Sequence, residues 1–159
     1  MDLFVLRHGR AVREPPRGGS DRDRSLSSRG RGDTERTAGW IRESGLIFDT
    51  IGTSPYLRAV ETATIIADAI PLRNHLEVWE ELAPGGERED IMDRIYRSGE
   101  SVLIVGHEPM LSSLVSDLIS GGTAQIHLGK GGLARIGNLT MLGRGELIWL
   151  LTRDCMGSP

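Results

Sequence analysis

The chain has 159 residues, of which 38% are hydrophobic, and a formal net charge of −3. This length fits one domain, over 1–159, with a core of its own, and the negative charge argues against a nucleic-acid partner. No apolar run approaches the roughly 18 residues that span a bilayer, and we find no secretion signal. A single cysteine, Cys155, has no disulfide partner within the chain, which favours a reducing, cytoplasmic setting.

The first part of the chain alternates between strand and helix patterns. A short apolar run predicts a buried strand over 3–6. Ser27 is a candidate N-cap for a helix that reaches about Ser44, although three glycines weaken this helix. A weaker strand pattern follows at 50–53, and apolar residues at helical spacing predict a helix over 56–70.

The second part repeats the alternation and ends differently. The clearest strand pattern lies at 102–105, and Pro109 suits the first turn of a helix that reaches about Ile119. Two strands at 132–139 and 146–152 flank a glycine-rich turn and read as a hairpin. The pattern predicts an α/β fold with helices on both faces of the sheet, in which the closing hairpin adds an antiparallel element.

The one long irregular stretch, 13–25, lies in a region rich in arginine. Between Arg10 and Arg36 the sequence has eight arginines against five acids. A mixed, solvated loop is the default interpretation. The alternative is that one or two of these arginines face an anionic substrate, and the sequence does not decide whether the loop closes over one.

Charged and polar residues follow each of the three predicted parallel strands. The first strand ends in Arg7-His8-Gly9, the second in SPYLRAVET (54–62), and the third in GHEPML (106–111). Open α/β sheets bind ligands outside the carboxyl ends of their strands. If the three strands are parallel neighbours, two histidines and two arginines converge there. His8 alone could simply close a strand; the group of four predicts an anion site.

Other phosphate, metal and hydrolase motifs are missing. GKGG at 129–132 has glycine where a P-loop needs a hydroxyl, and is better read as a turn before the hairpin. No Cys/His cluster has zinc spacing, and GTS at 52–54 is not a nucleophile elbow. Phosphoryl transfer fits what is present, because it needs mainly positioning and positive charge. A neutral imidazole can be the nucleophile, and we expect neighbouring guanidinium groups to lower its pKa.

Three ordered motifs carry a family resemblance. Arg7-His8-Gly9, then Ser54-Pro55-x-x-Arg58-Ala59-x-x-Thr62, then Gly106-His107 resemble the histidine phosphatase superfamily. The segments ELAPGG and VGHEPML look most like those of its SixA-type branch, the phosphohistidine phosphatases. The resemblance implies a single-domain, three-layer α/β/α fold of the phosphoglycerate mutase type, with a mostly parallel sheet and an antiparallel C-terminal strand. It implies neither a cofactor nor a metal.

The resemblance also implies roles for particular side chains. His8 would attack phosphorus and become phosphorylated, and water would then release phosphate. Arg7, Arg58 and His107 would hold the phosphoryl oxygens. Two further assignments are looser: Arg24 near the mouth of the substrate site, with a solvated loop arginine as its alternative, and Glu81 as the acid for the leaving group. Glu80 is the alternative to Glu81, and a helix-capping role is the alternative to both.

The expected activity is that of a metal-independent phosphatase acting on phosphohistidine in a signalling or phosphocarrier protein. One alternative is a phosphomonoesterase for small phosphate esters with the same site, and another is a non-catalytic phosphate-binding module. The chain is short for the lids that enclose small substrates in phosphoglycerate mutases, which favours an open, protein-accessible site. We expect a monomer without membrane contact, and structural or exposed positions for His75 and His127.

Overall fold

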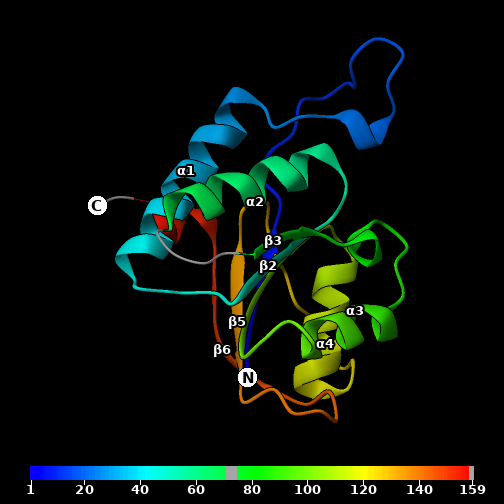
Figure 1. Ribbon diagram of the computed structural model, residues 1–159, viewed down its shortest axis with the longest axis vertical. Helices are drawn as coiled ribbons and strands as arrows, with labels where there is room; N and C mark the ends of the chain where they lie inside the picture. The colour runs from blue at the N-terminus through cyan, green and yellow to red at the C-terminus, as the bar shows by residue number, and fades with distance from the viewer. Residues whose placement is uncertain (71–74, 158–159) are drawn as a thin grey trace.

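The computed structural model describes residues 1–70 and 75–157, and its described strands form one six-stranded sheet (Figure 1). The strand order is β3-β2-β4-β1-β5-β6. The first four strands in this order are parallel, whereas β5 runs antiparallel to β1 and β6 runs antiparallel to β5. The strands are β1 (Asp2–Arg7), β2 (Thr50–Thr53), β3 (His75–Val78), β4 (Ser101–Gly106), β5 (Leu133–Gly137) and β6 (Glu146–Leu151).

Helices cover both faces of the sheet, in two pairs. The helices are α1 (Ser28–Glu43), α2 (Leu57–Ala69), α3 (Arg88–Tyr96) and α4 (Met110–Ser120), with short 3-10 turns η1 (Asp21–Asp23), η2 (Glu80–Leu82) and η3 (Arg153–Met156). Figure 1 shows α1 and α2 on one side of the strands and α3 and α4 on the other. No helix in 1–70 or 75–157 is long and apolar enough to cross a membrane.

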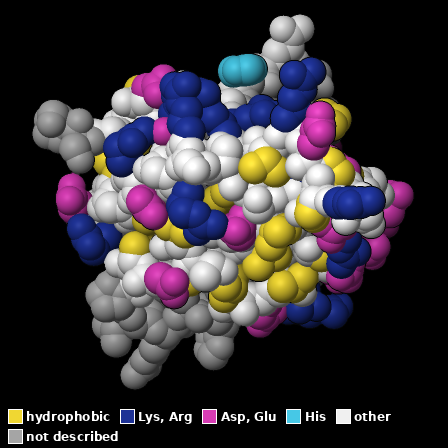
Figure 2. Space-filling model, turned by 90° about the horizontal axis from the view of Figure 1, so that it is seen from above, with side chains coloured by type: hydrophobic (Ala, Val, Ile, Leu, Met, Phe, Trp, Pro, Cys, Tyr) yellow, Lys and Arg dark blue, Asp and Glu magenta, His cyan; other side chains and the backbone are white. Residues whose placement is uncertain are grey.

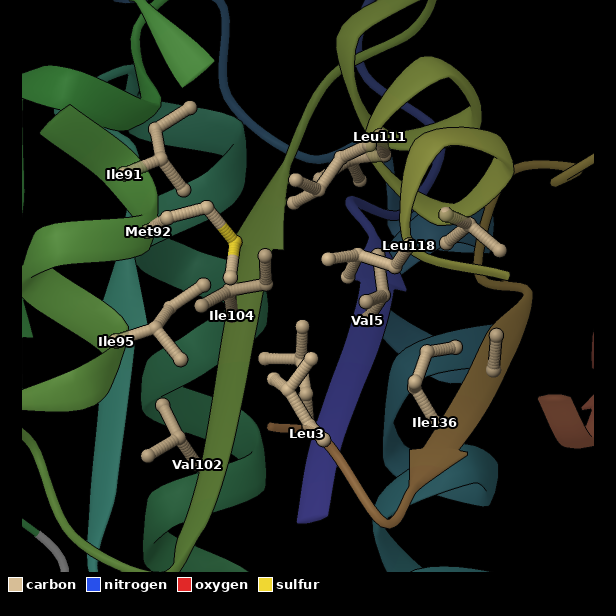
Figure 3. Packing of buried hydrophobic residues seen from close by; sticks show 14 of the residues in the cluster. Leu3, Val5, Ile91, Met92, Ile95, Val102, Ile104, Leu111, Leu118 and Ile136 are labelled. Carbon is tan, nitrogen blue, oxygen red and sulfur yellow. The ribbon is translucent and has the colours of Figure 1, made fainter. Parts of the chain in front are cut away.

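Alternation along the central strand β1 builds a core on each face. Leu3 and Val5 point into a cluster beneath α3 and α4, which Figure 3 shows from close by. Phe4 and Leu6 point into a second cluster beneath α1 and α2. Because successive side chains of a strand face opposite sides, a strand buried on both faces must be apolar throughout. This requirement explains the continuous apolar run at the start of the chain.

The register of the parallel strands brings their carboxyl ends to one edge. Arg7 of β1 lies opposite Gly106 of β4, and Thr53 of β2 lies opposite Val105. Hydrogen bonding continues just past the strands, since the Ser54 amide donates to the Val105 carbonyl at 2.9 Å. The three sequence motifs therefore begin side by side, at the end of the sheet that Figure 2 views from above.

The predicted fold class is confirmed, and the antiparallel strand next to β1 is β5. Ser27 caps α1 as predicted, because its Oγ accepts the Gly30 amide at 3.0 Å. Two elements were not predicted: β3, a four-residue strand at one edge of the sheet, and α3, a nine-residue helix. Both are short, and the many charges in α3 hide its buried stripe of Ile91, Met92 and Ile95.

Candidate active site

His8 follows the last residue of β1 and is almost fully buried. Its Nδ1 lies 2.7 Å from the Gly9 carbonyl oxygen. A carbonyl can only accept, so Nδ1 carries the hydrogen and Nε2 keeps its lone pair. The Arg58 Nε–H donates to that Nε2 at 3.3 Å. The ring is thus held in the tautomer that a nitrogen nucleophile needs.

Two glycines allow the chain after His8 to run close to α1. A Cβ on Gly9 would lie 2.7 Å from the Thr34 Oγ1, and a Cβ on Gly30 would lie 2.0 Å from the Arg10 carbonyl oxygen. Both separations are too short for a real side chain. Gly30, which weakens the helix pattern in the sequence, is therefore required by close packing against Arg10.

Arg58 lies in the first turn of α2, and Thr62, one turn later, ties this helix to β1. The Thr62 hydroxyl donates to the Arg58 carbonyl at 2.7 Å and accepts the Gly9 amide at 3.1 Å. The Arg58 guanidinium carbon lies 5.0 Å from the centre of the Tyr56 ring. The spacing Arg58-x-x-x-Thr62 thus places a cation at His8 and a hydroxyl at Gly9 on one helical face. Thr62 belongs to the second sequence motif, but its role in joining α2 to Gly9 was not predicted.

His107 lies directly after β4, with its ring centre 4.9 Å from that of His8. Its Nε2 lies 2.7 Å from the Ser54 Oγ, a partner that the sequence analysis did not assign. The Tyr56 ring packs edge-on against His107 with ring centres 5.0 Å apart. His8, Arg58 and His107 therefore converge as expected, from three segments far apart in the sequence.

Both histidines are neutral at physiological pH, mainly because they are buried. Burial lowers the pKa of His8 to about 3; the bond to the Gly9 carbonyl opposes this shift, and the charges of His107, Arg58 and Arg7 add to it. Burial also lowers the pKa of His107 to about 4, with Arg58 adding to the effect and Asp21 opposing it. The arginines were expected to be the cause, and they contribute, but desolvation is the larger effect.

Arg7 adds a further cation beside the two histidines. Its NH1 group donates to the Leu128 carbonyl at 3.0 Å, which ties the side chain to the segment before β5. Its Nε–H is buried and has no hydrogen-bond partner among the described residues. Burying a donor without a partner costs about 1 to 3 kcal/mol. An anion bound at this position would accept a hydrogen bond from the Arg7 Nε–H and offset this cost.

Asp21, the first residue of η1 in the loop 13–25, contacts the site and was not predicted to do so. Arg58 donates to it twice, from NH1 to the backbone carbonyl at 2.8 Å and from NH2 to Oδ2 at 2.9 Å. Arg24 donates to Asp21 Oδ1 at 2.7 Å and to the Val12 carbonyl at 2.8 Å. Hydrogen bonds from Arg24 and Arg58 lower the pKa of Asp21, so it is a carboxylate. The loop 13–25 therefore packs against the site. Arg24 does not contact Arg58 directly; Asp21 bridges the two arginines.

The two candidate proton donors lie in η2 and point to different partners. Glu80 is 70% exposed and pairs with Arg22 of the loop at 3.2 Å. Glu81 is 31% exposed and lies 4.0 Å from an Arg94 nitrogen. Neither makes a hydrogen bond or ion pair with His8, Arg58 or His107 in the described part of the chain. The role expected for Glu81 stays a prediction.

The remaining histidines lie outside this cluster. His127 is exposed, and the side chain of His75 lies outside the described residues. No group of three or more His, Cys, Asp or Glu side chains is placed to hold a metal ion within the described residues. What the geometry provides is an unprotonated ring nitrogen among guanidinium groups and a second imidazole. These groups could attack a phosphoryl group and stabilise the negative charge on its oxygens.

Comparison with known proteins agrees with this chemistry. The family model for the histidine phosphatase superfamily (branch 1) matches residues 3–85. The chain belongs to the histidine phosphatase superfamily. This membership supports the phosphatase activity that the sequence predicts.

Curated relatives of the superfamily lead to the SixA-type branch. The chain is 30% identical to phosphohistidine phosphatase SixA of Escherichia coli over 77% of each chain. It is 32% identical to a SixA homolog of Haemophilus influenzae, over 74% of this chain and 77% of that protein. The recognised resemblance is confirmed by both.

Solved structures show the same fold. The structure of SixA complexed with tungstate superposes with a TM-score of 0.87 at 26% identity, covering 98% of this chain and 99% of that one. The α-ribazole phosphatase from Shigella flexneri gives a TM-score of 0.71 at 18% identity, covering 96% and 97% of the two chains. The second likeness concerns the fold alone.

Proposed function

We propose that this protein is a phosphohistidine phosphatase that works through a phosphohistidine intermediate on His8. The observation that carries the proposal is the His8 ring, whose Nδ1–H is held by the Gly9 carbonyl while Nε2 faces the Arg58 guanidinium. The relatives named phosphohistidine phosphatase support the substrate class.

The first proposed step transfers the phosphoryl group to the enzyme. His8 Nε2 attacks phosphorus in line, the bond from phosphorus to the substrate imidazole breaks, and that imidazole takes up a proton. Positive charge develops on the His8 ring, and the Gly9 carbonyl stabilises it through the Nδ1–H. Arg7, Arg58 and His107 surround the phosphoryl oxygens with positive charge and donors. The positive charge of these arginines does the work that a metal ion would do, so metal independence is part of the proposal.

The second step returns His8 to its starting state. Water attacks phosphorus, the bond from phosphorus to Nε2 breaks, and phosphate leaves. Glu81, with Glu80 as the alternative, is the proposed donor of the proton that the substrate imidazole takes up in the first step. The resulting carboxylate takes a proton back from the attacking water in the second step. Imidazole is a better leaving group than an alkoxide, so a phosphohistidine substrate depends less on this acid than an ester does.

Substrate binding requires an exchange of partners at Arg58. Both terminal nitrogens of its guanidinium are bonded to Asp21. Phosphoryl oxygens would replace these acceptors, and the released Asp21 carboxylate would stay bonded to Arg24. The bond from the Arg58 Nε–H to His8 Nε2 would break as well, because the lone pair that accepts it is the one that attacks phosphorus. Monomeric state and a cytoplasmic location remain predictions.

Trapping the intermediate tests the proposal. Incubation with a phosphocarrier protein labelled with ³²P on histidine, followed by an alkaline quench that preserves phosphohistidine, should leave label on the wild-type chain. His8→Ala should remain unlabelled and inactive while its circular dichroism spectrum is unchanged. Label on His8→Ala, or none on an active wild type, would contradict the mechanism.

The same preparation separates the alternatives. A higher kcat/KM for the phosphohistidine protein than for sugar phosphates supports the proposed substrate, and the reverse order identifies a small-molecule phosphomonoesterase. Phosphate binding without turnover of any donor identifies a binding module.

A further inference from the structure

A cavity of about 590 Å³ lies near the candidate active site. Cationic side chains from four separate segments line it, and we refer to it as the basic cavity. The lining residues that matter here are Arg10, Arg29, Lys130, Arg153 and Asp154. None of the four cations has a role in the proposed phosphoryl transfer.

The basic cavity adjoins the candidate active site through the backbone. Arg10 follows His8 by two residues. On the opposite wall, the turn that carries Lys130 is fixed to Arg7, because the Gly131 amide donates to the Arg7 carbonyl at 3.1 Å and the Arg7 NH1 donates to the Leu128 carbonyl at 3.0 Å. The walls of the cavity are therefore joined to Arg7 and His8, and we expect other groups of a substrate bound at His8 to reach it.

Positive charge exceeds negative charge around the basic cavity. Arg10, Arg36 and Arg153 all pair with one buried carboxylate, that of Asp33. Arg153 also pairs with Asp154, at 2.6 Å.

Two of the lining cations have no carboxylate of their own. Arg29 and Lys130 form no salt bridge within the described residues. Partial burial lowers the pKa of Lys130, and the charges of Arg7, Arg24, Arg10 and Arg58 add to this effect. In Figure 2, dark blue side chains gather on the face at this end of the molecule. A second anion would relieve this repulsion.

We propose that the basic cavity binds a carboxylate side chain of the substrate protein, an Asp or Glu that lies near the phosphohistidine. The inference rests on the proposed function and adds a specificity site to it. Two cations without a salt bridge among the described residues match the charge of one carboxylate better than they match the several charges of an extended polyanion. Arginine pairs with carboxylates through two parallel hydrogen bonds, which favours a fixed position for the acidic residue.

The test compares phosphohistidine peptides that differ in one residue. A single Glu is scanned through the positions flanking the phosphohistidine, and each peptide has a partner with Gln at that position. For the best position, kcat/KM of the wild type should be about fivefold higher with Glu than with Gln, the size expected of one or two partly exposed ion pairs. Arg29→Glu should abolish or reverse the preference, and Lys130→Gln should reduce it.

A matched control removes the effect of overall charge. Arg97 is 80% exposed at the end of α3, beyond the amino ends of the strands, so Arg97→Glu changes the net charge equally and should keep the preference. Arg29→Glu should fold normally, because a carboxylate in the first turn of α1 interacts favourably with the helix dipole. It should also keep the wild-type kcat/KM for the Gln peptides.

Binding of stable phosphoryltriazole peptides distinguishes the two proposals. Tighter binding of the Glu peptide, lost in Arg29→Glu, supports the basic cavity even if phosphohistidine is not hydrolysed, in which case only the proposed function fails. Equal affinity for Glu and Gln peptides, or a preference that survives Arg29→Glu, overturns the inference and leaves the phosphatase proposal standing. A preference for a small bisphosphate over every Glu peptide also overturns it.

Discussion

At the scale of single residues, Arg58 connects the parts of the site. Its three donor nitrogens face His8 Nε2, the Asp21 carbonyl and the Asp21 carboxylate. Arg58 is only 7% exposed, and its guanidinium lies over the Tyr56 ring. The surrounding residues therefore leave few other conformations for this side chain. The guanidinium is therefore already placed beside His8, so phosphate binding exchanges its hydrogen-bond acceptors without moving the side chain far.

Arg58→Ala should therefore lower kcat/KM for a phosphohistidine substrate about 100-fold to 1000-fold, as the loss of one preorganised donor does elsewhere. Steady-state kinetics measures this. Arg22→Ala is the control and should stay close to wild type. Arg22 lies on the same loop as Asp21, but its one salt bridge among the described residues is with exposed Glu80. A rate for Arg58→Ala within a few-fold of wild type would show that Arg58 does not bind the transferring group.

At the scale of elements, the contact between α1 and the chain after β1 sets the position of His8. Ser27 caps the helix through the Gly30 amide, and its own amide donates to the Arg10 carbonyl at 2.9 Å. Gly30 faces that same carbonyl at a distance no side chain tolerates. Gly32 and Gly39 of the same helix face open space. Three glycines that look alike in the sequence thus differ in what they do.

Gly30→Ala should destabilise the protein by about 1 to 3 kcal/mol, because the added methyl group must displace the Arg10 backbone. Gly32→Ala and Gly39→Ala should each stabilise it by about 0.5 to 1 kcal/mol, since alanine favours the helix and meets no neighbour. Urea unfolding at neutral pH measures all three. Equal effects at the three positions would mean that α1 does not pack on Arg10 as described.

At the scale of the whole molecule, building the site at the end of a sheet buries two imidazoles. His8 is 7% exposed and His107 is 4% exposed. In the unfolded chain each would take up a proton near its ordinary pKa of 6.5, whereas in the folded chain the values are about 3 and 4. The unfolded state therefore binds more protons than the native state between these limits, and acid favours unfolding there.

The free energy of unfolding should fall as the pH is lowered from about 6.5 towards 4, with up to about 1.4 kcal/mol per pH unit from each histidine. Above pH 7 these two groups should contribute no slope. Urea melts across this range measure the effect, and the double variant His8→Gln with His107→Gln should flatten it. His127→Gln, at an exposed position, should leave the slope unchanged; a slope that survives the double variant has another origin.

Much of the fold was predictable because its signals are local. Apolar runs mark strands that are buried on both faces, as in β1 and β4, and helical spacing marks α2 and α4. β3 and α3 were not predicted, because a four-residue strand and a highly charged nine-residue helix have weak sequence patterns and depend on tertiary packing for their stability. His8, Arg58 and His107 were found because each lies at or just after the end of a strand.

The sequence by itself determined the order of the elements other than β3 and α3, the family, and the four candidate site residues His8, Arg7, Arg58 and His107. Only the tertiary structure decided that Asp21 binds Arg58, that Glu80 and Glu81 face different arginines, and that Arg10, Arg29, Lys130 and Arg153 share one cavity. These contacts join segments far apart in the chain, and the sheet register and the packing of helices set their distances. Charges of one residue type look equivalent along a sequence; only their positions in space determine which of them meet.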